Sequence, residues 1–400
     1  MARDTDSSGQ PVNRVDWLDA LRGWAILGVL LVHSSQNVTT LTGNWKAIAD
    51  AGQYGVQLFF VVSALTIGLT YERQLTHKVT TGRATFAWLI KRYFRIGPLY
   101  YFGIALYLAV FTGMRMLGSQ LPANGPFDIL ANVLFVHSWI PSAQNTVVPG
   151  GWSIGVEMCF YLVAPILFLT LRSARSSLLA FAAVIIVVVA LNHGMAFIMT
   201  GHAAIENNSF LYFWFPTQLP VFLAGIALYR CAGTQLWKEK ALHEDAAAFA
   251  LIAALFFGVA GLMLGTVGDL DNSLAPTAMG IAFAGLALGC RTPVAATLLV
   301  NRATTWIGQI SYSVYINHFV LVLALRFVEK RFNLMDVIPA PLLFMATFAL
   351  VLGLSLPMSL LTRRMIEAPG IDIGHRLAAA LEGRRHLFTR GPARGTEVRR

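Results

Sequence analysis

The stretch VDWLDALRGWAILGVLLVHSSQ, residues 15–36, decides how the whole chain is interpreted. Its apolar part approaches the roughly 20 residues that a membrane-spanning helix needs, yet it contains Asp19, Arg22 and His33. At about 100° per residue, Arg22 and His33 return to the same helix face, and Asp19 is close enough to Arg22 to pair with it. Because ionisable residues inside a membrane face protein or a wet cavity, we expect this face to be functional.

Composition places the whole chain in the same environment. Of the 400 residues, 56% are hydrophobic and only 12% are charged, whereas a soluble domain averages about 25% charged residues. We therefore predict an all-α polytopic membrane protein with about ten transmembrane helices around a central polar cavity. The predicted spans are the apolar runs at about residues 17–35, 54–71, 96–114, 152–171, 177–199, 211–229, 246–266, 274–290, 306–328 and 340–362.

Lys and Arg residues are unevenly distributed between the predicted loops. If the N-terminus is cytoplasmic, the inner loops hold most of them, and the outer loops hold chiefly Lys46, Arg115, Lys330 and Arg331. Because cytoplasmic loops carry the excess of Lys and Arg, we expect a multi-pass protein of the inner (cytoplasmic) membrane with both termini in the cytoplasm. The net charge of +10 then indicates membrane lipids as partners, and not nucleic acid.

The chain divides into three predicted parts. Residues 1–16 form a cytoplasmic N-terminal segment, residues 17–369 form the transmembrane domain, and residues 370–400 form a basic cytoplasmic tail. We expect this tail to be disordered and to lie against anionic lipid headgroups. The apolar run 127–140 is too short to cross the bilayer, so it is predicted to be re-entrant or interfacial.

A cluster of cations stands at the entry to the third predicted span, in KRYFRIGPLYY, residues 91–101. Arg92 and Arg95 are three residues apart, so they share a helix face. An ordinary positive-inside anchor explains such a cluster. An anion clamp explains it as well, because the planar guanidinium fork suits phosphates and a nucleotide-bearing cofactor would approach from this side.

Polar side chains also occur inside other predicted spans. Ser153, Glu157 and Tyr161 recur at four-residue spacing on one helix face, and an unpaired glutamate there should cost several kcal/mol. An ion pair with an arginine of another helix or a place in a wet cavity would each account for Glu157. Two further groups are the lone Ser63, which an ordinary backbone hydrogen bond would explain, and the face formed by Ser311, Tyr315 and His318.

These residue types favour acyl-transfer chemistry over several alternatives. Histidine is the usual general base near neutral pH, so His33 could deprotonate an acceptor hydroxyl or could itself carry the acyl group as a nucleophile. No G-x-S-x-G elbow, H-E-x-x-H pair or P-loop lysine motif is present. The three cysteines have no ligand-like spacing, so we expect no metal.

The motifs resemble those of the membrane-bound acyltransferase 3 family, which includes glycan O-acetyltransferases, over roughly residues 15–370. The resemblance rests on several elements in order: LDALRGWAILGVLLVH (18–33), FFVVSA (59–64), KRYFRIGPLYY (91–101), WSIGVEMCFY (152–161), SYSVYINH (311–318) and the Glu367/Pro369 pair. Ala64 stands where the family usually has glycine, and Ile316 stands where it usually has leucine. The first departure puts the close approach of the helices there in doubt.

The resemblance implies transfer of an acyl group, commonly acetyl, from cytoplasmic acyl-coenzyme A to a hydroxyl of an extracytoplasmic acceptor such as a glycan. It makes Arg22 and His33 the essential pair, adds Glu157 to the catalytic residues, and assigns Arg92 and Arg95 to the donor's phosphates. The same central cavity is expected to be lined by Asp19, Ser63, Trp152, Ser153, Tyr161, Ser311, Tyr315 and His318.

Two other classes of protein fit the same polar helices. A transporter or flippase of a glycan or lipid-linked intermediate also needs polar faces inside the membrane, and an inactive scaffold would keep the helices alone. The intact Arg22/His33 pair argues against the scaffold. An acyltransferase consumes acyl-coenzyme A and releases a free thiol, whereas a transporter moves its substrate unmodified, so an assay separates the two remaining classes.

Overall fold

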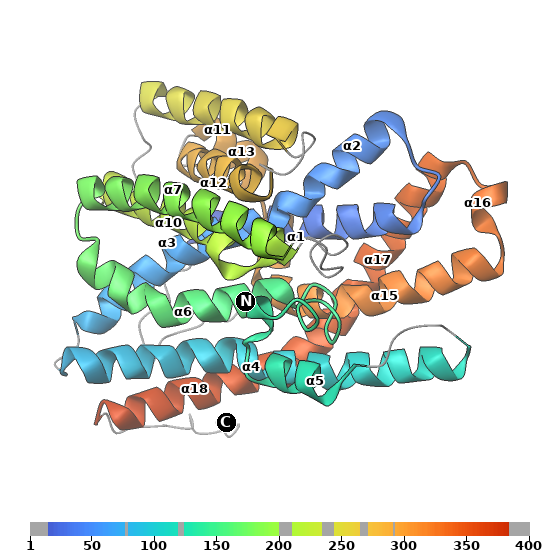
Figure 1. Cartoon of the computed structure of the whole chain (residues 1–400), viewed down its shortest axis with the longest axis horizontal. Coiled ribbons are helices and arrows are strands. Elements are labelled where there is room, and N and C mark those ends of the chain that lie inside the picture. Colours follow the sequence, from blue (N-terminus) through green and yellow to red (C-terminus); the bar gives the residue numbers. More distant parts are fainter. Residues whose placement is uncertain are drawn as a thin grey trace, which may run out of the picture.

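The computed structural model describes residues 15–76, 79–118, 124–199, 210–233, 244–264, 271–290 and 293–383. Within these ranges every regular element is a helix and none is a strand, as Figure 1 shows. Seven helical stretches are long and apolar enough to cross a membrane. The prediction of an all-α polytopic membrane protein is therefore confirmed.

The seven stretches account for most of the length of the described chain. They are Gly43–Leu75, with α2 (Gly43–Ala51), η1 (Gly52–Tyr54) and α3 (Gly55–Leu75); α4 (Thr81–Met116); α6 (Trp152–Thr170); α7 (Ala174–Ile198); Phe210–Ala232, with α9 (Phe210–Phe213) and α10 (Phe215–Ala232); α15 (Ser311–Arg331); and Ala340–Leu381, with α17 (Ala340–Thr362), η4 (Arg363–Glu367) and α18 (Ala368–Leu381).

Three more predicted spans are helical in the structure without belonging to the seven. They are α1 (Asp16–Asn37), α11 (Glu244–Leu264) and α12 (Asp271–Gly289). The two apolar helices α11 and α12 pack against each other, and Figure 1 shows them together at one side of the molecule. Short helices α13 (Pro293–Leu299), α14 (Arg302–Gln309) and α16 (Leu334–Val337) connect the longer ones.

Helix α1 lies in the interior of the helical assembly. It packs against α3, α14, α15 and α17, and its residues Leu21, Ile26 and Leu30 are at most 1% exposed. Burial on most sides explains how a helix with Asp19 and Arg22 can be placed in an apolar assembly, because neighbouring helices supply partners that lipid cannot. The helix that carries the unusual charges is thus the one that the others surround.

The prediction of one continuous span over 306–328 is wrong in one respect, because α14 ends at Gln309 and α15 begins at Ser311. The side chain of Asn301 caps the start of α14. Near the end of α14, Gly308 lies directly against α1, where an added Cβ would stand only 1.7 Å from the Asp19 carbonyl oxygen. This close approach holds α14 against α1 and separates it from α15.

Helices α4 and α18 pack along each other (Figure 1). Gly370 and Gly374 face Pro98 and Phe94 of α4 at distances that leave no room for a Cβ, as is usual where small residues let two helices approach closely. The chain therefore stays helical to Leu381, beyond residue 370, where we expected a disordered tail to begin. Residues 1–14 and 384–400 of the predicted terminal segments lie outside the described residues.

The run 127–140 does not span the assembly, as predicted. It contains α5 (Pro126–Val133), which has eight residues, and the single turn η2 (His137–Trp139). His137 is buried and its Nε2 donates to the Gly151 carbonyl oxygen at 2.8 Å. Burial lowers the pKa of His137 to about 4, so the ring stays neutral near neutral pH. This hydrogen bond joins the short helices to the start of α6.

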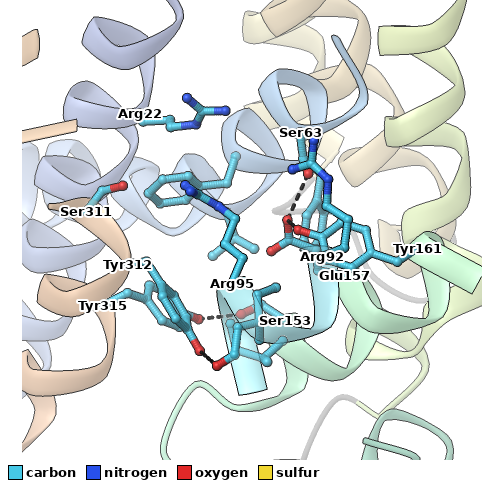
Figure 2. A pocket seen from close by; sticks show the side chains of 15 residues that line it. Arg22, Ser63, Arg92, Arg95, Ser153, Glu157, Tyr161, Ser311, Tyr312 and Tyr315 are labelled. Atoms are coloured by element: carbon cyan, nitrogen blue, oxygen red, sulfur yellow. Dashed lines mark hydrogen bonds between the residues drawn. The ribbon is translucent and has the colours of Figure 1, made fainter. Parts of the chain in front are cut away.

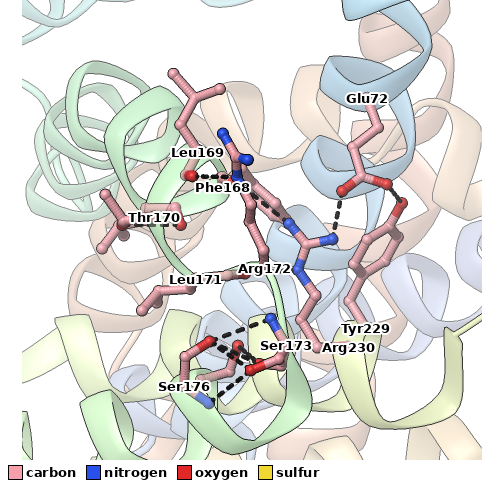
Figure 3. A network of polar contacts seen from close by, with 12 residues as sticks. Glu72, Phe168, Leu169, Thr170, Leu171, Arg172, Ser173, Ser176, Tyr229 and Arg230 are labelled. Atoms are coloured by element: carbon pink, nitrogen blue, oxygen red, sulfur yellow. Dashed lines mark hydrogen bonds and ion pairs between the residues drawn. The ribbon is translucent and has the colours of Figure 1, made fainter.

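At the far end of α6, Arg230 of α10 joins three helices (Figure 3). Its guanidinium pairs with Glu72 of α3 at 2.5 Å and donates to the carbonyl oxygens of Leu171 at 2.7 Å and Phe168 at 3.0 Å. Tyr229 donates to the other Glu72 oxygen at 2.6 Å. Because the last carbonyls of a helix lack partners within the helix, Arg230 caps α6 while it ties α10 to α3.

Candidate active site

A cavity lies between helices α1, α3, α4, α6 and α15, and its empty space is about 680 Å³ when the part open to solvent is included. Figure 2 shows polar side chains from all five helices converging on it. The lining residues are Arg22, Val56, Phe59, Phe60, Ser63, Arg92, Arg95, Ile96, Ser153, Ile154, Glu157, Tyr161, Ser311, Tyr312 and Tyr315.

Arg22 is held in the wall of the cavity by two partners. Its Nη1 pairs with Asp19 Oδ1 at 2.8 Å, one turn earlier on α1, and its Nη2 donates to Thr66 Oγ1 of α3 at 2.6 Å. The predicted pairing of Asp19 with Arg22 is therefore present. Asp19 itself does not line the cavity; it acts through Arg22, by fixing where the guanidinium points.

Arg92 is also fixed by its neighbours. It donates to Thr70 of α3, and its guanidinium carbon lies 5.3 Å from the ring centre of Trp88 and 5.8 Å from that of Tyr161. Aromatic faces attract a cation at these distances. Arg92 is thus oriented by contacts that leave most of its charge uncompensated by a carboxylate.

Arg95 differs from the other two arginines. Figure 2 shows its side chain extending into the cavity, and it makes no hydrogen bond to any residue in the described part of the chain. The carboxylate of Glu367 accepts a hydrogen bond from Ser313 at 2.6 Å. It attracts Arg95 without direct contact, as do the carboxylates of Glu157 and Asp19. The donors of Arg95 are therefore available to a ligand.

Glu157 is the only acidic residue among those that line the cavity. Its Oε1 accepts hydrogen bonds from Ser63 Oγ at 2.8 Å and from Tyr161 OH at 2.6 Å. Within the described residues it forms no direct ion pair with an arginine, which removes one of the two explanations that its sequence position allowed. Arg22 is already paired with Asp19, whereas neither Arg92 nor Arg95 forms an ion pair within the described residues. These two guanidinium groups stand beside the single lining carboxylate of Glu157, so this part of the cavity suits an anion.

Tyr315 and Ser153 form one end of the cavity. Ser153 Oγ lies 2.7 Å from Tyr315 OH, which also donates to the Gly150 carbonyl oxygen at 2.9 Å. Gly150 has a φ of +72°, and an added Cβ would lie 2.9 Å from the Phe319 ring. Only glycine adopts that conformation readily and leaves this space, so Gly150 permits the contact between this turn and α15.

His33 and His318 lie beyond Tyr315, outside the lining of the cavity. His33 Nδ1 is 3.1 Å from His318 Nε2, and both rings pack on Phe319, with centroid distances of 4.3 and 4.2 Å. The Tyr315 ring lines the cavity and also contacts His318, with centroids 5.8 Å apart. Tyr315 is therefore the residue that connects the cavity with the histidine pair.

Most of the predicted site residues meet in this region. Four of them do not line the cavity: Asp19, Trp152, His33 and His318. Trp152 instead packs on Phe60 and Phe213, with centroids 6.0 and 4.6 Å away. The predicted residues that do line it are Arg22, Ser63, Arg92, Arg95, Ser153, Glu157, Tyr161, Ser311 and Tyr315.

Sequence reasoning missed several residues that build the site. Tyr312 lines the cavity and donates to the Ile96 carbonyl oxygen at 2.8 Å. Thr66 and Thr70 bind Arg22 and Arg92. Ser63, Thr66 and Thr70 recur at the spacing of one helix face, and that hydroxyl stripe was the signal that could have found them.

No group of three His, Cys, Asp or Glu side chains that could hold a metal ion occurs within the described ranges. The cavity instead offers guanidinium, hydroxyl and phenol donors around one carboxylate. Donors of this kind suit an oxygen-rich anionic ligand.

Comparison with known proteins identifies the family of the chain. The chain matches the model of the acyltransferase 3 family, described as an acyltransferase domain, over residues 15–360. The chain belongs to this family of membrane acyltransferases.

Individual relatives carry a related name. The chain is 26% identical over 328 residues to proteins named "Putative O-acetyltransferase" from Staphylococcus aureus strains COL, MSSA476 and MRSA252, a match that covers 76% of this chain. It spans about half the length of these relatives, 50% in each case. No solved structure matches the chain.

Proposed function

We propose that this protein transfers an acyl group from acyl-coenzyme A to a hydroxyl of an extracytoplasmic acceptor. The names of its relatives suggest acetyl as the acyl group, and a glycan is the acceptor class that the family suggests. The observation that carries the proposal is that Arg92 and Arg95 line the cavity without an ion pair, and that Arg95 makes no hydrogen bond to the part of the chain that the structure describes. A buried positive charge is costly unless an anion pairs with it, and the phosphates of acyl-coenzyme A would supply that anion.

Arg92 and Arg95 would hold the donor's phosphates through charge-assisted hydrogen bonds. Both lie in the half of α4 nearest to its N-terminus, which would face the cytoplasm if the predicted positive-inside orientation holds. Arg22, fixed by Asp19 and Thr66, would bind a further oxygen of the donor. We therefore propose that the protein lies in the inner membrane, that both termini are cytoplasmic and that the acyl donor enters from the cytoplasm.

The acyl end would point towards Tyr315 and Ser153, because these residues close the end of the cavity next to the histidine pair. Arg22 and His33 are eleven residues apart on α1, which corresponds to roughly 16 Å along the helix axis. That length would be bridged by the flexible arm of the thioester. The Tyr315 side chain would have to move for the acyl carbon to reach His33.

The test is an acyl-transfer assay with purified protein in liposomes. Wild-type protein should release free coenzyme A from acetyl-coenzyme A in the presence of an envelope glycan and should add one acyl group to it, as mass spectrometry would show. His33→Ala should lower the rate by at least about 100-fold, the lower end of what a general base contributes. His193→Ala, which changes an exposed histidine on α7, is the matched control and should retain activity.

Two results would contradict the proposal. Full activity in His33→Ala would remove the histidine from the reaction. Movement of unmodified glycan across the membrane, without consumption of acetyl-coenzyme A, would instead identify a transporter or flippase.

A further inference from the structure

The hydrogen bonds of the His33/His318 pair determine which ring nitrogens carry protons. His318 Nδ1 lies 2.8 Å from the Tyr315 carbonyl oxygen and 3.2 Å from that of Val314. A carbonyl oxygen only accepts hydrogen bonds, so His318 Nδ1 is the protonated nitrogen. In the neutral ring, His318 Nε2 therefore has a lone pair and accepts.

The same reasoning extends to His33. Its Nδ1 is 3.1 Å from His318 Nε2, and since His318 Nε2 is an acceptor, His33 Nδ1 must donate. The remaining nitrogen, His33 Nε2, is then the one with a free lone pair. A backbone carbonyl of α15 thus favours, through one intervening ring, a proton on Nδ1 of a residue on α1. The backbone of Val29, one turn earlier on α1, is a second partner of the His33 ring.

The surroundings favour this assignment. His318 is completely buried, and both rings pack against Phe319, which limits their rotation. No carboxylate pairs with either ring among the residues that the structure describes. The usual arrangement, in which a carboxylate orients a catalytic histidine, is replaced here by a second histidine bonded to backbone carbonyls.

We propose that His318 is a positioning residue, which holds His33 in the tautomer with a proton on Nδ1 and leaves Nε2 free to act as the base. This inference rests on the proposed function, since it assigns the acceptor's proton to one atom of that site. His33 Nε2 takes the hydroxyl proton as the acceptor oxygen bonds to the thioester carbon. When the carbon–sulfur bond breaks, the coenzyme A thiolate receives the proton from His33 Nε2. Throughout, His318 Nε2 accepts from His33 Nδ1 and stabilises the charged intermediate ring.

The test compares His318→Leu with His318→Gln. Leucine fills the space but accepts no hydrogen bond, so His33 loses its orientation and kcat should fall at least about 100-fold, while the KM values for donor and acceptor stay within about twofold of wild type. The side-chain carbonyl oxygen of glutamine can accept from His33 Nδ1. His318→Gln should therefore retain kcat within about tenfold of wild type.

A control separates this role from folding. Asn317, the preceding residue on α15, is equally buried and bonds Ser359 and Thr362 of α17. Asn317→Ala should lower the melting temperature and leave kcat of the folded protein within about twofold of wild type. Each variant is compared at equal amounts of protein that elutes as folded material from a sizing column.

Three outcomes would overturn the inference. These are an unchanged kcat in His318→Leu, a His318→Gln variant as inactive as His318→Leu, and a KM change that accounts for the whole loss. Each of them presupposes that the wild type transfers acyl groups and that His33→Ala does not. If the wild type is inactive, or His33→Ala is fully active, the proposed function fails instead.

Discussion

Arg95 in the cavity and Arg230 at the far end of α6 are both arginines inside a helical membrane protein, but they differ in their bonding partners. Arg230 has an ion pair with Glu72 and two backbone carbonyls as partners. Arg95 makes no hydrogen bond within the described residues and points into a cavity. A buried arginine whose donors are hydrogen-bonded stabilises the fold, whereas one whose donors are unpaired can bind an anionic ligand.

The first prediction, with the largest expected effect, is that Arg95→Ala strongly weakens donor binding without unfolding the protein. Loss of a charge-assisted bidentate contact should raise the KM for acyl-coenzyme A at least about 100-fold, which corresponds to roughly 2.7 kcal/mol. Arg83→Ala, on the exposed first turn of the same helix, is the control and should leave KM unchanged. Steady-state kinetics over a range of donor concentrations measures both. An equal KM for the two variants would place the donor elsewhere.

The second prediction is the reverse effect at Arg230. Arg230→Ala leaves Glu72 and the end of α6 without their partner, so the free energy of unfolding should fall by about 2–3 kcal/mol. The fraction that remains folded should keep wild-type KM and kcat. Thermal unfolding and activity per folded protein, measured on the same sample, give the two quantities. A stable variant with weak donor binding would show that the two arginines do not have separate roles.

The third prediction concerns the carboxylate between the arginines. Glu157→Gln keeps an oxygen that can accept from Ser63 and Tyr161 but removes the negative charge. We expect kcat to fall about tenfold, which corresponds to a rise of roughly 1.4 kcal/mol in activation free energy. The reason is that the negative charge of Glu157 no longer contributes to the electrostatic environment of the reacting thioester. Donor affinity should stay equal or increase, since the cavity becomes more positive. Weaker donor binding in this variant would contradict the proposed balance of charges.

How far the sequence predicts this molecule depends on the range of the interaction. Helix positions follow from local hydropathy, and the pairing of Asp19 with Arg22 follows from their spacing on one helix. The hydrogen bond between Glu157 and Ser63 joins α6 to α3. How two helices are aligned against each other cannot be derived from the sequence of either helix alone. Spacing could therefore indicate that Glu157 needs a partner, but not which partner it has.

His33 shows the same limit in another form. Helical periodicity predicts that His33 lies on the face of Arg22, but in the structure its ring packs on Phe319 beside His318, outside the cavity that Arg22 lines. The path of the cavity depends on how α15 and the Gly150 turn pack against α1. For the same reason α18 was missed, because the packing of Gly370 and Gly374 on α4 depends on a helix almost 300 residues earlier in the chain.

The most direct test of the central claim is a structure of the protein with a non-hydrolysable acyl-coenzyme A analogue, determined by electron cryo-microscopy in lipid. The account predicts phosphate oxygens within hydrogen-bond distance of Arg92 and Arg95 and the acyl end next to Tyr315, on the side of the His33/His318 pair. An analogue bound away from these arginines, or an acyl end that points away from Tyr315, would contradict it.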